Sequence, residues 1–384
     1  MGFLGYRRGD GGVGVRNHVL VMSSVSCANA VVQSIGNALP EVKTITHTEG
    51  CGRGPLDVPN SLRTLEGVAR HPNVAAVLVV GLGCETLKAE LVAERARGGD
   101  RSIETIGIQQ LGGTPRTIER GVEIARRMLD DVARCRREEF GFEHLTLALE
   151  CGGSDSMSGI TANPCVGVVA DWLIAQGGCA ILSELTEFVG TEPILGQRCA
   201  TPELREKLLG LLEAHGQRLE RELGAFAHQV ISPGNQEGGL SSIQEKSLGC
   251  IQKGGTTPIR QVVDYAEAPS EAGLVIMNTP GSDIFSITGK VAAGAQMVLF
   301  TTGRGTPAGS PIATVVKIAS NSRLFEWMPD DMDFDAGRVV AGMTIPEVGA
   351  ELIDLVGEVA NGRATKSELT RTELFAIHTV ASAF

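Results

Sequence analysis

Residues 145–161 read LTLALECGGSDSMSGIT and combine a strand, a glycine turn and the start of a helix. The apolar run 145–149 has the length and pattern of a buried strand. It leads directly into the turn 150–155, ECGGSD, and small residues that can start a helix follow. In an open α/β sheet, ligands bind just beyond the carboxyl ends of the strands. This stretch therefore predicts a parallel sheet with a functional site at its edge.

Upstream of this stretch, strand and helix signals alternate. Apolar and β-branched runs predict strands at 18–24, 42–46, 74–80 and 103–108. A helix is predicted after each of these strands: at 28–38, at 57–69, in the segment that ends near residue 96, and at 114–137. Such alternation is typical of a parallel sheet with helices on both faces. The Gly-rich leader 1–17 is expected to be a loop, either flexible or in contact with an anion. We therefore expect an α/β fold that opens with a Rossmann-like domain at residues 1–140.

The second part of the chain, 141–384, predicts a less regular α/β lobe that completes the active site. Further strands are expected at 180–182, 274–278 and 297–301, and helices at 201–228, 241–247, 282–293 and 345–361. The long Gly-rich stretch 232–258 is of a kind that is usually functional or disordered. The tail 371–384 carries no strong structural signal.

Composition excludes several classes of protein. The net charge of −11 and an aromatic content of 4% argue against a nucleic-acid binder, which is usually basic. The start of the chain has no apolar signal-peptide region, and no stretch approaches ~18 uninterrupted apolar residues, so no membrane helix is expected. The nine cysteines show no regular pairing, which fits free thiols in a reducing cytoplasm.

Cysteines follow the ends of four predicted strands. These are Cys27, Cys51, Cys84 and Cys151, and the last three stand beside Glu49, Glu85 and Glu150 in Gly-rich turns. If the strands are parallel, all four thiols would meet at one sheet edge, and Cys250 could reach the same cleft. A buried structural role remains open for Cys27. The other four cysteines, 135, 165, 179 and 199, are expected to be ordinary small core residues.

The chemistry of this cysteine set leaves two alternatives open. Three thiolates from Cys51, Cys84 and Cys151 could hold iron, including an iron–sulfur cluster with one iron open to substrate. Alternatively, His47 and Glu49, with other carboxylates, could hold a single divalent ion while the thiols lie nearby. No CxxC pair is present, so the spacing does not decide between them.

Polar and basic side chains in glycine- and threonine-rich loops are candidates for holding an anionic substrate. The set comprises Arg16, Asn17, Ser154, Lys290 and Arg304. The chain contains no GxxxxGK[ST] motif and no GxGxxG that opens a helix after a strand, so nucleotide binding is not supported. The absence of GxSxG argues against an α/β-hydrolase.

Several motifs together resemble the altronate/galactarate dehydratase family, which includes the large subunit of sulfolactate sulfo-lyase. They are GVGVRN at 12–17, HTEGCG at 47–52, GLGCE at 81–85, ECGGSD at 150–155, SGITANP at 158–164, the stretch 233–250 and NTPG at 278–281. The resemblance implies a metal-dependent lyase, ferrous or with another divalent metal. It would eliminate water or another leaving group from a hydroxy acid such as a sugar acid to give a 2-oxo acid. Single-chain members carry an extra small N-terminal domain, which implies a separate small subunit here or a member that works without one.

The expected chemistry assigns provisional roles. A base must take the proton α to the carboxylate, and Glu150 or Glu85 are the first candidates, with Asp155 and His47 as alternatives. Arg16, Lys290 or Arg304 would hold the carboxylate. A homo-oligomer is expected. Rival hypotheses are release of sulfite from sulfolactate, a non-catalytic sugar-acid-binding or scaffold subunit, and a redox protein.

Overall fold

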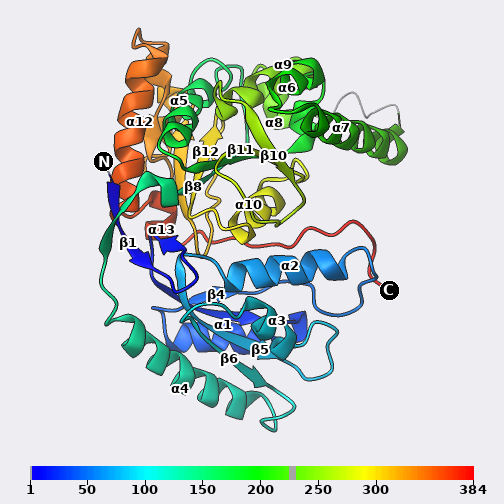
Figure 1. The fold of residues 1–384 in the computed structure, drawn as a ribbon, viewed down its shortest axis with the longest axis vertical. Coiled ribbons are helices and arrows are strands. Elements are labelled where there is room, and N and C mark those ends of the chain that lie inside the picture. The colour runs from blue at the N-terminus through cyan, green and yellow to red at the C-terminus, as the bar shows by residue number, and fades with distance from the viewer. Residues whose placement is uncertain (1, 225–230) are drawn as a thin grey trace.

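The computed structural model describes residues 2–224 and 231–384, and it confirms the α/β fold class. Two lobes stand one above the other, each built around its own parallel sheet (Figure 1). A third, three-stranded antiparallel sheet lies beside them; it joins β1 (Gly2–Arg7) to β2 (Val13–Gly14) on one side and β7 (Glu138–Gly141) on the other. The leader expected to be a loop is therefore two short strands.

The N-terminal lobe has a four-stranded sheet in the order β4-β3-β5-β6. Its strands are β3 (His18–Ser23), β4 (Lys43–Ile45), β5 (Val74–Gly81) and β6 (Ser102–Gly107). One face packs on α1 (Asn29–Ala38) and α4 (Thr114–Val132), and the other on α2 (Val58–Ala69) and α3 (Ala89–Ala96). Because helices cover both faces of this sheet, β5 is a continuous run of buried apolar residues.

The C-terminal lobe has a seven-stranded sheet in the order β10-β11-β9-β8-β12-β13-β14. Its strands are β8 (Thr146–Cys151), β9 (Cys179–Leu182), β10 (Ile259–Val263), β11 (Gly273–Met277), β12 (Met297–Thr302), β13 (Thr314–Ala319) and β14 (Phe334–Asp335). From β8 the chain winds to β9 on one side, and it later returns to β12 on the other. The β8–β12 pair is therefore the topological switch point, where ligands bind in such sheets.

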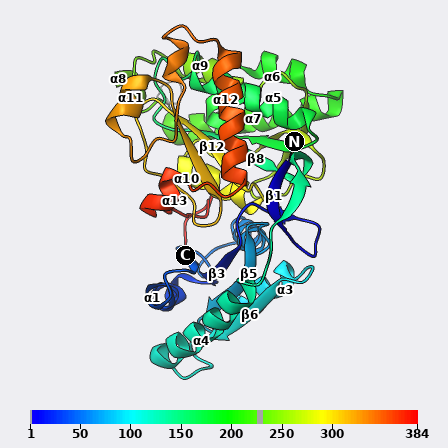
Figure 2. The ribbon, with the colours of Figure 1, turned by 90° about the vertical axis from the view of Figure 1, so that its left-hand side faces the viewer.

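Helices cover both faces of this larger sheet. On one face lie α5 (Ala162–Ala175) and α12 (Ile345–Ala360), which stand side by side in Figure 2. On the other face α10 (Asp283–Ala292) packs against α2 of the N-terminal lobe, so one apolar cluster is shared by both lobes. The remaining helices are α6 (Glu192–Arg198), α7 (Pro202–Leu223), α8 (Pro233–Glu237), α9 (Ile243–Cys250), α11 (Ser322–Trp327) and α13 (Lys366–Thr370).

Most expected elements are present, with shifted ends. The long helix predicted to reach residue 137 ends at Val132, because the chain then turns into β7. The helix predicted over 201–228 is described as far as Leu223, and its predicted residues 225–228 lie outside the described residues. The tail 371–384 runs across α2 between the lobes (Figure 1), and the Asn60 side chain of α2 donates to the His378 carbonyl at 3.1 Å. No helix in the described ranges is long and apolar enough to cross a membrane.

His71 stabilises the junction of the two lobes and makes it sensitive to acid. Its Nε2 lies 2.9 Å from the Ala295 carbonyl oxygen, and its Nδ1 accepts a hydrogen bond from the Asn73 backbone N–H. Burial lowers the pKa of His71 to about 4. Below about pH 6.5 the His71 imidazole is protonated in the unfolded chain but stays neutral in the folded chain. The free energy of unfolding therefore falls as the pH drops toward about 4.

We expect the protonation of His71 to lower the free energy of unfolding by about 3 kcal/mol between pH 7 and pH 4. In urea titrations at both pH values, a His71→Gln variant should lose less stability on acidification than the unsubstituted protein. A His144→Gln variant, at a site where 40% of the side chain is exposed, is the control and should follow the unsubstituted protein. Equal acid losses in the unsubstituted protein and the His71→Gln variant would contradict the assignment.

Candidate active site

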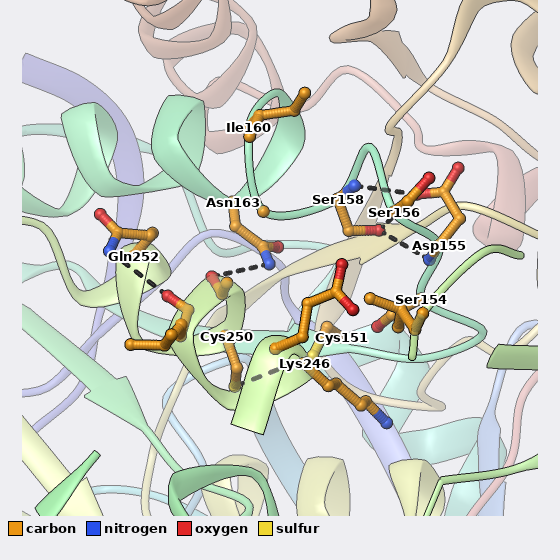
Figure 3. Close-up of a pocket in the computed structure, with 15 residues that line it drawn as sticks. Cys151, Ser154, Asp155, Ser156, Ser158, Ile160, Asn163, Lys246, Cys250 and Gln252 are labelled. Carbon is orange, nitrogen blue, oxygen red and sulfur yellow. Dashed lines mark hydrogen bonds between the residues drawn. The ribbon is translucent and has the colours of Figure 1, made fainter. Parts of the chain in front are cut away.

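A cavity of about 440 Å³ opens beyond the carboxyl end of β8, at the switch point of the larger sheet (Figure 3). Its wall comes from the turn after β8, the start of α5 and the helix α9. The lining residues include Cys151, Ser154, Asp155, Ser156, Ser158, Asn163, Glu245, Lys246, Cys250 and Gln252. The turn 150–155 thus forms one side of the cavity.

Two thiols lie at the base of this cavity. The Sγ atoms of Cys151 and Cys250 are 4.0 Å apart and face one another in Figure 3. Below them, Glu187 Oε2 is 2.8 Å and Glu184 Oε2 is 3.7 Å from the Cys151 sulfur. The four residues each offer a ligand atom, and these atoms lie within 4.8 Å of one another.

Three lysines neutralise the carboxylates around the thiols. Lys246 Nζ is 2.5 Å from Glu187 Oε1, Lys253 Nζ is 3.2 Å from Glu184 Oε2, and Lys290 pairs with Glu150. The Lys253 and Lys290 pairs are fully buried. Isolated charges are too costly to bury, so these acids and lysines stabilise one another as a network.

Burial and neighbouring charges shift the protonation equilibria of this network. Burial, together with the adjacent carboxylates of Glu150 and Glu187, raises the pKa of Glu184 well above its usual range. The pKa of the Cys151 thiol is raised by its contact with Cys250, by burial and by the carboxylates. Burial opposes the charged form of Lys253, yet the surrounding acidic groups raise its pKa. The raised pKa values mean that Glu184 and Cys151 favour their protonated forms, and a bound cation would favour the ionised forms instead.

Glu184 shows the strain typical of a functional position. Its backbone is left-handed, with φ 75°, a conformation that costs a residue with a side chain of order 1–3 kcal/mol. Its Oε1 and Glu150 Oε1 are buried and have no hydrogen-bond partner among the described residues. Unsatisfied buried oxygens call for an explanation such as an ion or a proton. Soft thiolates together with carboxylates form a donor set that fits iron or zinc.

Asp155 holds the turn in shape. Its Oδ1 accepts hydrogen bonds from the Ser158 backbone N–H, the Ser158 hydroxyl and the Ser320 hydroxyl, each at 2.8 Å. Its Oδ2 accepts one from Asn321 at 3.0 Å. Asn235 donates to the Ser154 carbonyl and accepts from Lys246. These bonds hold Asp155 in the turn, and both Asp155 and Ser154 line the cavity.

Three further predicted residues, Glu150, Lys290 and Arg304, do not line the cavity. Glu150 and Lys290 form their buried pair beneath the thiols, and Ser286 donates to the same Glu150 oxygen at 2.8 Å. Arg304 is part of the loop that contacts the Gly153 carbonyl, and its guanidinium pairs with the exposed Glu237 at 2.7 Å. Lys290 therefore holds Glu150.

Arg16 and Asn17, which were expected to contact an anion, are instead hydrogen-bonded to other parts of the protein. Arg16 donates all five N–H groups: two to Glu368, and the others to backbone carbonyls of residues 15, 359 and 363. Asn17 accepts from Arg8 and donates to the Val132 carbonyl. These side chains join the leader to the rest of the chain, and the structure does not bring them to the cavity.

The expectation that all strand ends meet at one edge is wrong. Cys51, Cys84, His47 and Glu85 belong to the four-stranded sheet, while Cys151 belongs to the seven-stranded sheet, so they follow strands of two separate sheets. Cys51 and Cys84 are exposed, whereas His47 and Glu85 are buried: His47 is hydrogen-bonded to the Ser23 carbonyl at the end of β3, and Glu85 to the Gly83 N–H of its own loop. The convergence of the cysteines required one shared sheet edge, but the strand 145–149 belongs to the second lobe and to its own sheet.

Glu184 and Glu187 were missed as site residues. They follow β9 directly in the segment 183–187, SELTE, so the rule that led to Cys151 applies equally to them. The parallel pairing of β8 with β9 brings the two strand ends together. A carboxylate after a buried strand is a weak signal without a partner, and the partner thiol became visible only in the fold.

Comparison with known proteins gives the same family over nearly the whole chain. Residues 142–382 match the family model of D-galactarate/Altronate dehydratase, C-terminal, and residues 5–133 match that of D-galactarate dehydratase/Altronate hydrolase, second domain. Altronate dehydratase of Escherichia coli (strain K12) is 37% identical over 94% of this chain and 74% of its own length. The galactarate dehydratase (L-threo-forming) of the same organism is 32% identical, over 94% and 73%.

A third relative is a subunit of a carbon–sulfur lyase. The (2R)-sulfolactate sulfo-lyase subunit beta of Chromohalobacter salexigens is 33% identical over 95% of this chain and 94% of its own length. The relatives are therefore sugar-acid dehydratases and one sulfo-lyase subunit, all enzymes of the lyase class. With both domain types matched in order, this chain belongs to the D-galactarate/altronate dehydratase family.

Proposed function

We propose that this protein eliminates water from a hydroxy acid, with a sugar acid as the substrate, to give a 2-oxo acid in a metal-dependent reaction. The observation that carries the proposal is the set of two thiols and two carboxylates at the base of the cavity beyond β8. Cys151 and Cys250 line the cavity itself, so a metal held there would be within reach of a small acid.

The donor set supports a single ferrous ion. Cys151, Cys250, Glu184 and Glu187 would hold it, and another divalent metal would use the same atoms. When bound, such an ion acts as a Lewis acid that stabilises negative charge on the substrate oxygens. Two features fit this assignment. Oε1 of Glu184 has no hydrogen-bond partner among the described residues and is available as a ligand. The three neighbouring lysines balance the charge of the carboxylates.

Side chains of the cavity wall supply the remaining functions. Lys246 is part of the cavity wall. Burial opposes its positive charge, but Glu187 and Cys151 raise its pKa, so the side chain stays protonated. We assign it the binding of the substrate carboxylate. Glu245 also lines the cavity; its Oε2 accepts two hydrogen bonds from Ser241, while its Oε1 has no partner among the described residues. Those bonds lower the pKa of Glu245, which keeps its carboxylate ionised but also makes it a weaker base. We assign the α-proton to Oε1 because that oxygen, unpartnered in the described part of the chain, belongs to a residue of the cavity wall.

A second candidate is elimination of sulfite from sulfolactate. The sulfo-lyase subunit beta is matched over almost its whole length, whereas altronate dehydratase is matched over about three quarters. That relative is a beta subunit, which implies a companion subunit, so we propose that a separate small subunit also completes this enzyme. The leaving group, water or sulfite, then separates the two candidates.

The test is a panel of altronate, galactarate and sulfolactate with the protein loaded anaerobically with ferrous iron, alone and with a small-subunit partner. We expect 2-oxo acid to form, and to stop when the metal is chelated. Glu245→Gln should lower kcat by about 10²–10⁴-fold, since it removes the base. Glu206→Gln, on the exposed side of α7, is the control and should keep full activity.

Each failure has its own meaning. If no acid of the panel gives a 2-oxo acid or sulfite with metal and partner present, the proposed function is overturned. If turnover survives complete metal removal, the metal role is overturned. Full activity of Glu245→Gln would overturn only the assignment of the base.

A further inference from the structure

Three exposed cysteines of the N-terminal lobe take no part in the cavity. Cys27, Cys51 and Cys84 follow β3, β4 and β5, which are neighbouring parallel strands. The strand order β4-β3-β5-β6 makes the β3–β5 pair the switch point of this smaller sheet. Its carboxyl edge is therefore a second place where the fold favours a ligand.

Hydrogen bonds join the three cysteine loops directly. The Ser26 backbone N–H donates to the Glu49 carbonyl at 3.0 Å, which links the loop of Cys27 to that of Cys51. The N–H groups of Thr86 and Leu87 both donate to the Gly50 carbonyl at 3.1 Å, which links the loop of Cys84 to that of Cys51. The three loops that carry the thiols are therefore joined to one another through their backbones.

The acids and the histidine of these loops are already occupied with holding them. Glu49 is buried and forms a two-point ion pair with Arg53, at 2.7 and 3.0 Å. Glu85 accepts from the Gly83 N–H at 2.6 Å and from the Ser24 hydroxyl at 3.1 Å. His47 uses Nε2 on the Ser23 carbonyl and Nδ1 on the Glu49 N–H. With these polar groups engaged, the exposed thiols are the remaining groups that could bind a ligand, and that of Cys84 accepts a hydrogen bond from the Gln109 side chain at 3.7 Å.

Glycines shape the turns that present two of the thiols. Gly50 and Gly52 flank Cys51 with φ of 106° and 70°, and Gly83 precedes Cys84 with φ of 128°. These are conformations that residues with side chains rarely adopt. A Cβ at Gly50 would stand 2.3 Å from the Ser24 carbonyl oxygen, so the close approach of two loops also requires glycine there.

We propose that Cys27, Cys51 and Cys84 bind an iron–sulfur cluster through three thiolates. Exposed cysteine is an unfavourable surface residue unless its sulfur has a use, and soft thiolates select iron–sulfur clusters, zinc or copper(I). A single tetrahedral ion needs its ligand sulfurs within about 4 Å of one another. The three sulfurs do not form a group within 4.8 Å among the described residues, whereas a cluster spreads its ligands over several metal ions.

Three protein thiolates leave one iron of a four-iron cluster without a cysteine. That iron would be open to an oxygen ligand, such as a carboxylate or hydroxyl of a small acid. This site is separate from the Cys151–Cys250 cavity, since the two belong to different sheets, and the inference does not rest on the proposed elimination.

The experiment is anaerobic reconstitution of the full chain with ferrous iron, inorganic sulfide and a thiol reductant, followed by removal of unbound ions. We expect about four irons and about four acid-labile sulfides per chain at this site, with the broad visible absorbance of a cluster. Cys27→Ser, Cys51→Ser and Cys84→Ser should each lose the sulfide and the absorbance. Because all three side chains are exposed, the variants should fold, which circular dichroism checks.

Two controls make the result specific. Cys135→Ser removes another exposed thiol, beyond α4, and should retain the cluster in full. Cys250→Ser alters the cavity and should also retain the sulfide, even if iron at the cavity is lost. Absence of bound sulfide in the unsubstituted protein, zinc in its place, or full retention of sulfide in any of the three loop variants would overturn the proposal.

Discussion

Cys250→Ser is expected to lose the metal of the cavity and nearly all activity. Cys250 is buried at 1% exposure, its sulfur is 4.0 Å from that of Cys151, and both belong to the group of four potential ligands. Serine is a far weaker ligand for iron than thiolate, so its hydroxyl would not replace the sulfur. We expect kcat/KM to fall by about 10²–10³-fold, as happens when one group that stabilises the charge of the transition state is removed.

Metal analysis of the desalted protein and turnover of the same sample check this prediction together. Cys199→Ser is the matched control, because Cys199 is half-buried and donates only to the Leu195 carbonyl, which serine can also do. That variant should keep both metal and activity. A Cys250→Ser protein with unchanged metal affinity would remove this cysteine from the ligand set, and a metal-free variant with full activity would end the metal role.

Lys290→Met is expected to destabilise the protein severely. Lys290 and Glu150 are fully buried and pair with each other, and Lys290 also donates to the Leu149 carbonyl at 2.6 Å. Removing the lysine leaves a carboxylate uncompensated in the core of the sheet, which typically costs about 3–5 kcal/mol. We expect a fall of that size in the free energy of unfolding, measured by urea titration.

The double variant Lys290→Met/Glu150→Gln provides the sharper test. Because the buried charge is removed together with its partner, most of the lost stability should return. Arg304→Met breaks the ion pair with Glu237, whose side chains are 44% and 65% exposed, and should cost less than about 1 kcal/mol. A Lys290→Met protein as stable as the Arg304→Met protein would show that the buried pair contributes little.

Much of the fold could be predicted because its signals are local. The run 74–80 is apolar at every position, which only a strand covered on both faces tolerates, and it is β5. The helix predicted to begin at residue 114 does begin there, as α4, with Pro115 in its first turn and Gly113, not Thr114, as its N-cap. The leader was misjudged because its strand β1 is paired with β7, about 130 residues away, and pairing at that distance leaves no local pattern.

The site was predictable only in part, and for the same reason. Cys151 and Lys290 were recognised as candidates, and both lie in or beside the thiol–carboxylate network. Glu184 was passed over because its importance comes from a left-handed backbone and an unpartnered oxygen, neither of which is visible in a sequence. Arg16 looked like an anion contact because a glycine-rich loop usually exposes its arginine, yet all five of its N–H groups are taken internally.

The sequence by itself determined the α/β class, the strand ends that carry the reactive groups, and the family motifs, since hydrophobic period and glycine turns are properties of neighbouring residues. Only the tertiary structure decided which strand ends share a sheet. It placed Cys151 with Cys250, Glu184 and Glu187, and left Cys51 and Cys84 on the other sheet with Cys27. The physical reason is that strand order depends on long-range pairing and on burial of each sheet face, which no local pattern encodes.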